Sequence, residues 1–264
     1  MTLQGRVAIV VGASGGIGAA TVRALCREGA TVVLAALPDA LLDAIAAEVA
    51  YSGVPSLVVP TDITRREDID VLVARTLVEF GRIDVLVNAA GIATRPSIAD
   101  ETDADLERMV AINLLGCARA MHAVMPIMKA QRSGSIISLG SVAGEIGVLG
   151  IYSATKFGLR GLSDTVRREV RSYGIGVTLI EPGFVQTSMN PAMTNLPSPD
   201  IVADAIIAAI RRPRRRVIVP GSYRFVVAIA KAAPGMLDLV FGNARIQERL
   251  NRDNDVRVGD PGSP

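Results

Sequence analysis

The chain has 264 residues, half of them apolar and only 3% aromatic, and its 28 basic and 26 acidic side chains give a net charge of +2. A chain of this length can bury a full sheet, and a core of Val, Ile, Leu and Ala suits a parallel sheet covered on both faces. The balanced charge and the lack of tryptophan argue against a nucleic-acid surface. His122 is the sole histidine, which argues against a Ser-His-Asp triad and against a His-based metal site. We predict no metal site.

Two further features indicate a cytoplasmic protein. Residues 1–6 lack the charged-then-apolar layout of a signal peptide, and no uninterrupted apolar run reaches the about 18 residues that cross a membrane. Cys26 and Cys117 lie in helix-like segments without metal-ligand spacing, which fits reduced thiols.

The first predicted strand, residues 6–11, runs into a glycine-rich turn and then a helix. The turn reads G-x-x-x-G-x-G from Gly12 to Gly18. Such a turn lets the backbone approach a pyrophosphate, and the free N–H groups and dipole of the helix attract its charge. Glycines also serve tight turns in proteins that bind nothing. At the start of an alternating chain, the turn predicts a nucleotide site formed by Gly12, Ser14, Gly16, Ile17 and Gly18.

Short apolar runs alternate with amphipathic segments along the rest of the chain. The pattern predicts further strands at 31–35, 56–59, 85–87, 135–139, 176–180 and 217–219, with helices at 39–51, 67–80, 105–130, 152–173 and 200–210. Repeated strand–helix units give right-handed crossovers, so the predicted fold class is α/β, a doubly wound parallel sheet with helices on both faces. Residues 188–199, rich in Pro, Asn, Ser and Met, are expected to form a loop over the site.

Ligands of such sheets bind beyond the carboxyl ends of the strands. Asp62 follows one strand and could accept a hydrogen bond from an adenine amino group, or cap a helix or turn. Asn88, Ala89 and Gly91 follow the next strand, and these small residues suit the close approach of a flat ligand, or a simple turn.

Tyr152 and Lys156 are four residues apart, so on a helix they share a face. A phenol has an unperturbed pKa near ~10, and a neighbouring ammonium favours its charged form, which permits proton transfer near neutral pH. Such a pair also arises by chance, as a surface lysine beside a half-buried tyrosine. Asn113, amid a helical pattern, is disfavoured by propensity and therefore needs a partner.

Taken together, these motifs resemble the short-chain dehydrogenase/reductase family over residues 3–220. The order and approximate spacing match at the glycine turn, Asp62, Asn88-Ala89-Ala90-Gly91, Asn113, Ser141, Tyr152-x-x-x-Lys156 and Pro182-Gly183. The resemblance implies a Rossmann fold of seven parallel strands, NAD or NADP as cofactor, and a catalytic set of Asn113, Ser141, Tyr152 and Lys156. It also implies cofactor contacts by the following residues: Asp62, Asn88, Ala89, Gly91, Tyr152, Lys156, Pro182, Gly183, Val185 and Thr187.

The resemblance also implies a role for each catalytic residue. Tyr152 would donate the proton to the nascent alkoxide, or remove it in the oxidative direction, and Ser141 would hydrogen-bond the same oxygen. Lys156 would hold the nicotinamide ribose and favour the ionised tyrosine, and Asn113 would anchor a water that returns the proton. The reaction expected is the interconversion of a carbonyl and a secondary alcohol by hydride transfer.

The sequence departs from the family in two places. Val11 precedes Gly12 where the family usually has threonine, which removes one hydroxyl near the turn. Ser141 lies 11 positions before Tyr152, a shorter gap than is common. Ser138 is nearer the usual spacing but falls inside a predicted strand, so we choose Ser141. A shortened loop between residues 144 and 151 would then reshape one wall of the substrate pocket.

Cofactor preference is expected to show after the second strand, where an acidic residue selects NAD and an arginine selects NADP. The segment Ala36-Leu37-Pro38-Asp39 shows neither in the usual place, and Gly15 supplies no basic side chain in the turn. Asp39 favours NAD if its loop folds back, but it also suits the N-cap of the next helix. The choice between NAD and NADP stays open.

The chain is predicted to consist of a domain, residues 1–220, and a C-terminal extension, residues 221–264. The extension holds an apolar stretch from Tyr223 to Phe241, preceded by an arginine run at 211–216. The stretch is expected to close the pocket or form a subunit interface, or else to meet a membrane surface. The end of the chain resembles those of family members that act on steroids, retinoids or other lipophilic alcohols, which implies a small to medium apolar substrate, steroid-, retinoid- or lipid-like. We also predict a homo-oligomer, dimer or tetramer. A cofactor-sensing regulatory module and a 3-oxoacyl thioester reductase are the alternatives.

Overall fold

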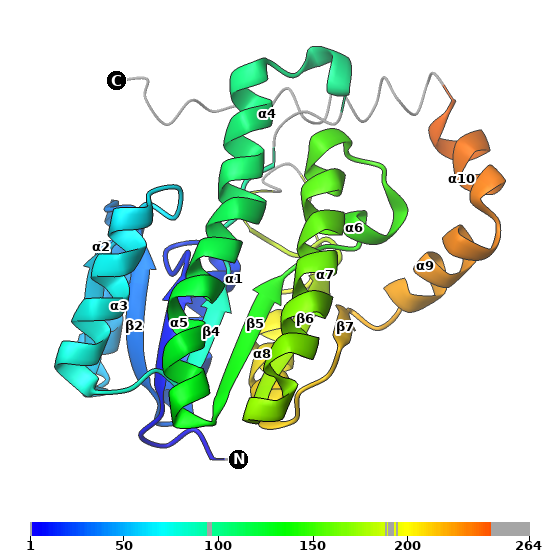
Figure 1. Ribbon diagram of the computed structural model, residues 1–264. Coiled ribbons are helices and arrows are strands. Elements are labelled where there is room, and N and C mark those ends of the chain that lie inside the picture. Colours follow the sequence, from blue (N-terminus) through cyan, green and yellow to red (C-terminus); the bar gives the residue numbers. More distant parts are fainter. Residues whose placement is uncertain (1, 94–96, 188, 190–192, 194, 244–264) are drawn as a thin grey trace.

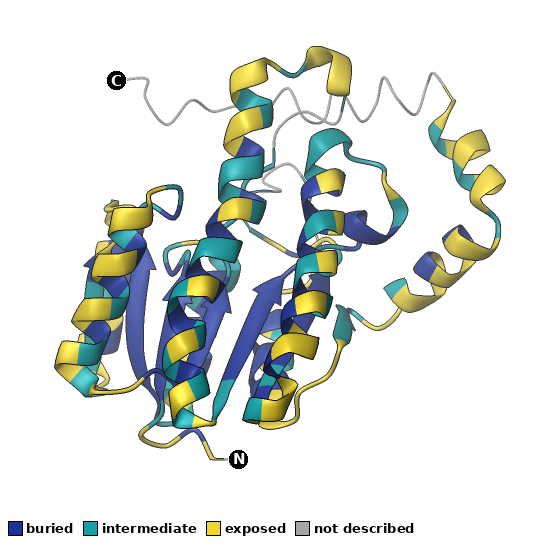
Figure 2. Ribbon diagram, in the orientation of Figure 1, coloured by how far each residue is buried: buried dark blue, intermediate teal, exposed yellow. Residues whose placement is uncertain are grey.

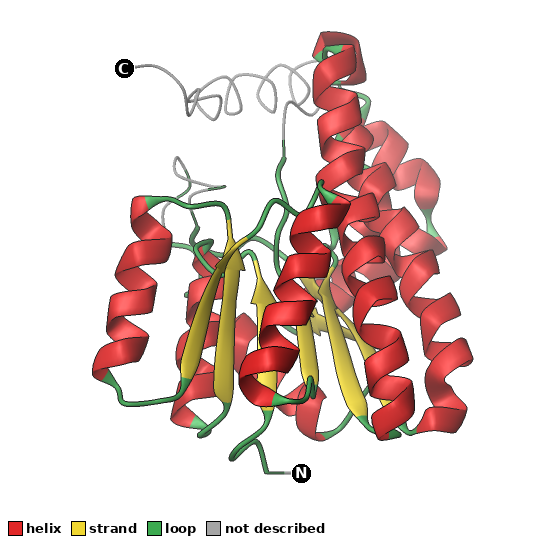
Figure 3. Ribbon diagram, turned by 60° about the vertical axis from the view of Figure 1, so that its left-hand side comes forward, coloured by secondary structure: helices red, strands yellow, loops and turns green. Residues whose placement is uncertain are grey.

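The structure, a computed structural model, describes residues 2–93, 97–187, 189, 193 and 195–243. Its centre is a seven-stranded sheet in the order β3-β2-β1-β4-β5-β6-β7, with every neighbouring pair parallel (Figures 1 and 3). The strands are β1 (Val7–Val11), β2 (Thr31–Ala36), β3 (Ser56–Pro60), β4 (Val85–Asn88), β5 (Gly134–Leu139), β6 (Ile175–Pro182) and β7 (Arg216–Val219). The predicted doubly wound α/β fold is confirmed.

Helices cover both faces of the sheet, and each face has its own apolar core (Figure 2). One core joins the sheet to α1 (Gly16–Arg27), α2 (Ala40–Tyr51) and α8 (Asp200–Arg211). The other joins it to α3 (Arg66–Phe80), α5 (Cys117–Gln131) and α7 (Gly150–Val170). Strands β1 and β2 are buried along their whole length, which explains why they read as continuous apolar runs rather than as an alternation.

The remaining elements lie mostly at the carboxyl ends of the strands. They are η1 (Ile98–Asp100), α4 (Asp103–Val110), α6 (Ala143–Ile146), α9 (Tyr223–Ala232) and α10 (Pro234–Phe241), with η3 (Arg171–Tyr173) closing α7 at the other end. Figure 1 shows α9 and α10 reaching away from the edge of the sheet beyond β7. The four-residue helix α6 was not predicted, because one helical turn carries no apolar periodicity.

The predicted continuous α-helix at 105–130 needs correction. The segment is helical from Asp103 to Gln131, but its middle, η2 (Ala111–Gly116), is a π-helix between α4 and α5. A π-turn shifts the backbone hydrogen bonds by one residue, and such turns are frequent at functional sites. By length and composition this helix could cross a membrane, yet a core helix passes the same test, and its Met109, Met121 and Met128 are fully buried.

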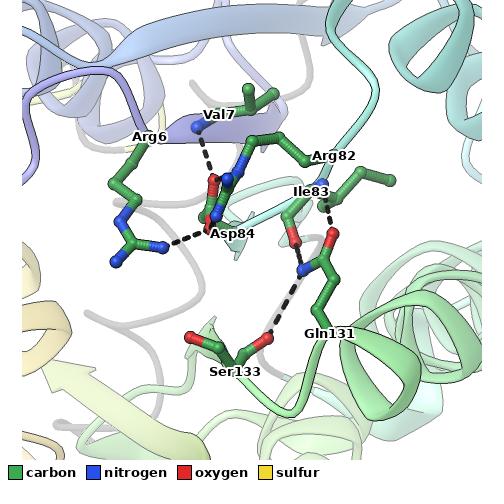
Figure 4. Close-up of polar contacts among 7 residues, drawn as sticks. All are labelled: Arg6, Val7, Arg82, Ile83, Asp84, Gln131 and Ser133. Atoms are coloured by element: carbon green, nitrogen blue, oxygen red, sulfur yellow. Dashed lines mark hydrogen bonds and ion pairs between the residues drawn. The ribbon is translucent and has the colours of Figure 1, made fainter.

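The amino end of the sheet is fastened by a buried carboxylate, Asp84 (Figure 4). Its oxygens accept hydrogen bonds from Arg6 Nη1 at 2.8 Å, from the Val7 backbone at 3.0 Å and from Arg82 Nε at 2.7 Å. Burial alone would raise the pKa of Asp84, but the hydrogen bonds from Arg82, Val7 and Arg6 outweigh it and hold that pKa below its usual value. This network ties β1 to β4 at the end of the sheet opposite to the candidate site.

Candidate active site

The glycine turn lies where β1 and β4 meet, at the point where the strand order reverses. Val11 pairs with Asn88 across these strands, so the two strand ends open side by side. Gly12 has φ +83°, and a Cβ there would come within 2.5 Å of the Ala90 backbone nitrogen. A Cβ at Gly18 would overlap the carbonyl oxygen of Gly12. Both positions therefore require glycine, because the backbones approach so closely.

The amino terminus of α1 is arranged to receive an anion. Gly15 is its N-cap and gives no side-chain hydrogen bond, so the first N–H groups, those of Gly16, Ile17 and Gly18, have no partner within the helix. These residues line a cavity, and the positive end of the helix dipole points into it. A Cβ at Gly16 would come within 2.9 Å of Thr187 Cγ2, so this wall is also close-packed.

A single cavity of about 410 Å³ joins the glycine turn to the predicted catalytic residues. Its lining is mostly apolar, and it includes Ser141, Tyr152 and Lys156. The predicted site residues that line it are Gly16, Ile17, Gly18, Ala89, Gly91, Ser141, Tyr152, Lys156, Pro182, Gly183, Val185 and Thr187. Elements far apart in the sequence thus meet at one pocket beyond the carboxyl ends of the strands.

Tyr152 and Lys156 share a face of α7, as their spacing predicts. The Lys156 Nζ lies 5.4 Å from the centroid of the Tyr152 ring. Lys156 is buried, 4% exposed, and its ammonium donates a hydrogen bond to the Leu139 carbonyl at 3.0 Å. The Ser141 Oγ accepts a hydrogen bond from the Ala143 backbone at 3.1 Å, which leaves its own hydrogen free to donate. Ser138, the other candidate serine, is fully buried in β5 outside the cavity lining.

The start of α7 is fixed by a reciprocal contact around Tyr152. The Leu149 N–H donates to the Ser153 Oγ at 3.0 Å, and the Ser153 N–H donates to the Leu149 carbonyl at 3.2 Å. This contact resembles a cap that satisfies the first backbone groups of the helix. The segment between Ser141 and Tyr152 supplies Ile146, Val148 and Leu149 to the cavity lining, so it forms one wall of the pocket.

Asn113 has the partner that its mid-helix position requires. Its Nδ2 donates to the Ile92 carbonyl at 2.8 Å, and its Oδ1 accepts from the Ile92 N–H at 2.9 Å. The same Nδ2 lies 3.3 Å from the Thr155 Oγ1 on α7. The side chain is fully buried and lies outside the cavity lining, so it holds the segment after β4 against α7 rather than facing a ligand directly.

Four other predicted residues also lie outside the cavity lining: Gly12, Ser14, Asp62 and Asn88. Gly12 determines the shape of the turn without lining the cavity. The Asp62 Oδ1 accepts hydrogen bonds from the Thr64 N–H at 2.8 Å and the Thr64 Oγ1 at 2.7 Å, which is the turn alternative stated above. The Asn88 Nδ2 donates to the Ser138 Oγ at 3.4 Å, while its buried Oδ1 has no partner among the described residues.

Cofactor preference is expected to be set by the segment after β2. The first side chains of this segment offer no charge that is available to a ligand. Leu37 is 57% exposed. The Asp39 carboxylate accepts a hydrogen bond from the Leu42 backbone at 2.7 Å and is the N-cap of α2. Of the two expectations for Asp39, the cap is therefore the one that the structure shows.

Three cavity residues from the C-terminal extension were not singled out from the sequence. Tyr223 and Val226 of α9 and Phe241 of α10 line the cavity, and the Tyr223 ring packs so closely on Gly183 that a Cβ there would overlap it. The apolar composition of this stretch predicted a pocket-closing segment as one alternative. Which side chains face the cavity depends on how α9 leaves β7, and this has no signal in the sequence.

Three of the five arginines in the run 211–216 are held in ion pairs. Arg211 pairs with Glu28, Arg215 Nη2 lies 2.6 Å from Asp164, and Arg216 pairs with Glu145. The Asp164 partner keeps the pKa of Arg215 above its ordinary value, and the same pair lowers the pKa of Asp164. Within the described part of the chain, no group of three His, Cys, Asp or Glu side chains could hold a metal ion.

Comparison with known proteins identifies the family. The family model described as short chain dehydrogenase matches residues 6–196. The chain belongs to the short-chain dehydrogenase family. Among its relatives, an uncharacterized oxidoreductase of Staphylococcus haemolyticus is 36% identical over 217 residues, 80% of this chain and 93% of that protein. A 3-oxoacyl-[acyl-carrier-protein] reductase of Synechocystis is 36% identical over 234 residues, 88% of this chain and 92% of that protein.

A solved structure supports the same fold. A short chain dehydrogenase/reductase from Burkholderia phymatum, in complex with NAD, superposes with a TM-score of 0.83 at 22% identity, covering 90% of this chain and 96% of that one. As a short-chain dehydrogenase, the chain is an NAD(P)-dependent oxidoreductase. The residues present fit a dinucleotide. The amino terminus of α1 has no side-chain cap and faces the cavity, and the glycines of the turn have no side chains that would block a pyrophosphate there.

Proposed function

We propose that this short-chain dehydrogenase interconverts a carbonyl and a secondary alcohol on a small to medium apolar substrate, steroid-, retinoid- or lipid-like. One observation carries the proposal: Ser141, Tyr152 and Lys156 lie on a cavity of about 410 Å³ that is otherwise mostly apolar and ends at the glycine turn. The dinucleotide would fill the part of this cavity beside the glycine turn, and the mostly apolar lining of the remainder suits an apolar molecule held by a few polar groups.

The polar residues of the pocket have complementary roles in the proposal. NAD(P), when bound, supplies or accepts the hydride. Tyr152 donates a proton to the substrate oxygen or removes it in the reverse direction. The Ser141 hydroxyl, whose oxygen already accepts from Ala143, donates a hydrogen bond to the same oxygen and stabilises negative charge there. These two side chains come from different elements, so only the fold brings them together.

Lys156 and Asn113 act behind the phenol. The Lys156 ammonium has three hydrogens, and its bond to Leu139 leaves two for the tyrosine side and for ribose hydroxyls. Asn113 is proposed to anchor the water that returns the proton. Because Ile92 engages both atoms of its amide, that water would bind carbonyl groups of the π-helical turn that holds Asn113.

The cofactor contacts are proposed for the residues named from the sequence. Gly12, Ser14, Gly16, Ile17 and Gly18 form the pyrophosphate turn. The adenosine and nicotinamide halves are assigned to Asp62, Asn88, Ala89, Gly91, Tyr152, Lys156, Pro182, Gly183, Val185 and Thr187. The lining of the cavity by most of these residues supports the assignment.

Reduction of 3-oxoacyl thioesters is the second candidate, and the name of the Synechocystis relative favours it. The contribution of Tyr223, Val226 and Phe241 to the lining favours the apolar ketone instead, since these groups close the cavity with hydrophobic surface. A screen of ketones of graded size beside an acetoacetyl thioester tests the two. Faster turnover of the thioester than of every ketone would reject the main proposal. Binding of NADH without turnover of any of these substrates would favour the cofactor-sensing module.

A cytoplasmic homo-oligomer, dimer or tetramer, is part of the proposal, as is contact of α9 and α10 with a membrane surface. The membrane contact would rest mainly on the apolar side chains of these helices, because three of the five arginines of 211–216 are engaged in ion pairs. Phe225 is 75% exposed and Leu239 is 81% exposed. Light scattering tests the oligomer. Flotation with anionic vesicles, compared between the wild type and Phe225→Asp, tests the membrane contact.

A further inference from the structure

Glu145 is a buried carboxylate that gathers three cations from three separate elements. It lies on α6, and none of its side chain is exposed. Arg160 of α7 places its Nη1 2.9 Å from Oε1, and Arg216 of β7 places its Nη1 2.5 Å from the same oxygen. Lys231 of α9 pairs with the other oxygen, Oε2.

The burial of this carboxylate makes the three partners necessary. An ionised group taken out of water is strongly disfavoured unless opposite charges and hydrogen bonds replace the lost solvation. The cations remain partly solvated, with 29% of the Arg160 side chain, 32% of Arg216 and 42% of Lys231 exposed. Elements that supply these cations are therefore held against α6, and a change in one cation is tolerated better than a change in the carboxylate.

On one side of this cluster, the helix that carries Glu145 packs against the catalytic segment of α7. Glu145 lies four residues after Ser141, on the helix that follows it. The neighbouring Gly144 packs on α7 so closely that a Cβ there would come within 2.8 Å of the Lys156 Cβ. The position of α6 is thus linked to the part of α7 that carries Lys156.

The other side of the cluster is the wall of the cavity. Lys231 lies on the same helix, α9, as Tyr223 and Val226, which line the cavity. That helix also exposes apolar residues, Phe225 at 75% and Ile229 at 56%. Since much of its apolar surface is not buried in the core, apolar packing alone holds α9 weakly, and the ion pair with Glu145 becomes important.

We infer that Glu145 is a positioning residue that fastens α9 to the Ser141 segment through Lys231, and thereby sets the substrate side of the cavity. The inference concerns specificity and affinity for an apolar substrate, not the proton transfer. Its substrate readout rests on the proposed function, whereas its structural readout does not.

Hydrogen exchange of the full chain tests the structural part. Lys231→Met is expected to raise the exchange of the α9 amides about tenfold while those of α2 stay as in the wild type. Lys231→Arg keeps the charge and is expected to restore the wild-type pattern. Lys129→Met is the matched control, because Lys129 pairs with Glu169 at 2.7 Å on a distant surface. Unchanged exchange of α9 in Lys231→Met, or an equal rise in Lys129→Met, would overturn the inference.

Glu145→Gln is the second variant, and it removes the charge shared by all three partners. Its α9 amides are expected to exchange at least as fast as those of Lys231→Met, and adding Lys231→Met to it should bring little further change because the two side chains act as one pair. Fully additive effects of the two substitutions on the exchange of the α9 amides would contradict the inferred pairing of Glu145 with Lys231.

Kinetics then test the role in specificity. With a bulky apolar ketone, Lys231→Met is expected to raise KM several-fold at nearly unchanged kcat, because the reacting residues keep their places. A loss of kcat at unchanged KM would assign Lys231 to the chemistry and overturn the positioning role. If no ketone is turned over by the wild type, the proposed function fails, while the exchange experiment still decides whether Glu145 holds α9.

Discussion

The Lys156 ammonium lies 5.4 Å from the centroid of the Tyr152 ring and at the same time donates a hydrogen bond to the Leu139 carbonyl at the end of β5. The lysine is thus held by a strand end while its charge stays next to the phenol. This relationship joins α7 to the sheet at the point where the cavity begins, and it supports the proposed role of Tyr152.

Replacing Tyr152 by Phe removes the hydroxyl that is proposed to transfer the proton. We expect kcat to fall by about 100- to 10,000-fold, the usual contribution of a general acid or base, while NADH still binds. Steady-state rates and a fluorescence titration with NADH measure the two effects. Tyr173→Phe is the control, because the Tyr173 ring lies 5.4 Å from the Lys129 ammonium, far from the cavity. Wild-type turnover in Tyr152→Phe would reject the mechanism.

The two candidate serines can be separated by paired alanine substitutions. Ser141→Ala removes a donor on the cavity and is expected to lower kcat by about 100- to 1,000-fold, as for loss of a hydrogen bond to developing negative charge. Ser138→Ala changes a fully buried strand residue that accepts from Asn88, so it should affect stability more than turnover. Rates and melting temperatures of both variants are the measurements. A larger loss of kcat in Ser138→Ala would transfer the role to Ser138.

Leu37 offers a direct test of cofactor preference, because it follows β2 and is 57% exposed. We expect Leu37→Asp to favour NADH over NADPH by about tenfold and Leu37→Arg to shift the ratio the other way, as expected for one charged hydrogen bond gained or lost. The ratio of the two Kd values, measured by titration of each variant and of the wild type, checks this. Identical ratios in all three proteins would place the 2′ position of the ribose elsewhere.

Glu181 is expected to make stability fall as the pH rises from about 4.5 toward neutrality. Burial raises the pKa of this β6 carboxyl to about 7, although the charges of Arg216 and Arg160 oppose the shift. The folded state therefore binds a proton that the unfolded state has already lost, and stability decreases between about pH 4.5 and pH 7. The loss amounts to about 3 kcal/mol at most. Glu181→Gln should gain stability relative to the wild type at pH 8 compared with pH 5, measured by urea unfolding. An equal difference at both pH values would contradict the assignment.

The contribution of Asp84 to stability is expected to change with pH in the opposite sense to that of Glu181. Its folded pKa is lowered, so its contribution is present above the unfolded pKa and is lost as the pH falls through the folded pKa. Asp84→Asn breaks a buried ion pair and is expected to cost about 3 kcal/mol at pH 7 without changing kcat at 25 °C. Asp70→Asn is the control, because the Asp70–Arg66 pair is about half exposed and should contribute under about 1 kcal/mol. Equal losses in the two variants would show that the Asp84 network is not special.

The sequence by itself determined the fold class, since alternating strands and helices admit few arrangements other than a parallel sheet covered on both faces. It also determined the glycine turn and the Tyr152–Lys156 pair, because both depend on local geometry. The spacing of four residues places the pair on one helix face wherever the helix packs. The family likewise follows from the order of the motifs along the chain.

Only the tertiary structure decided which distant segments pack around these residues. The π-turn at Asn113, the short helix α6 and the contact of Tyr223 with Gly183 depend on how distant segments pack, and no local pattern encodes them. The same holds for Glu145, whose three cations come from α7, β7 and α9. A buried charge finds its partners through the fold, because long-range pairs are set by packing and not by spacing along the chain.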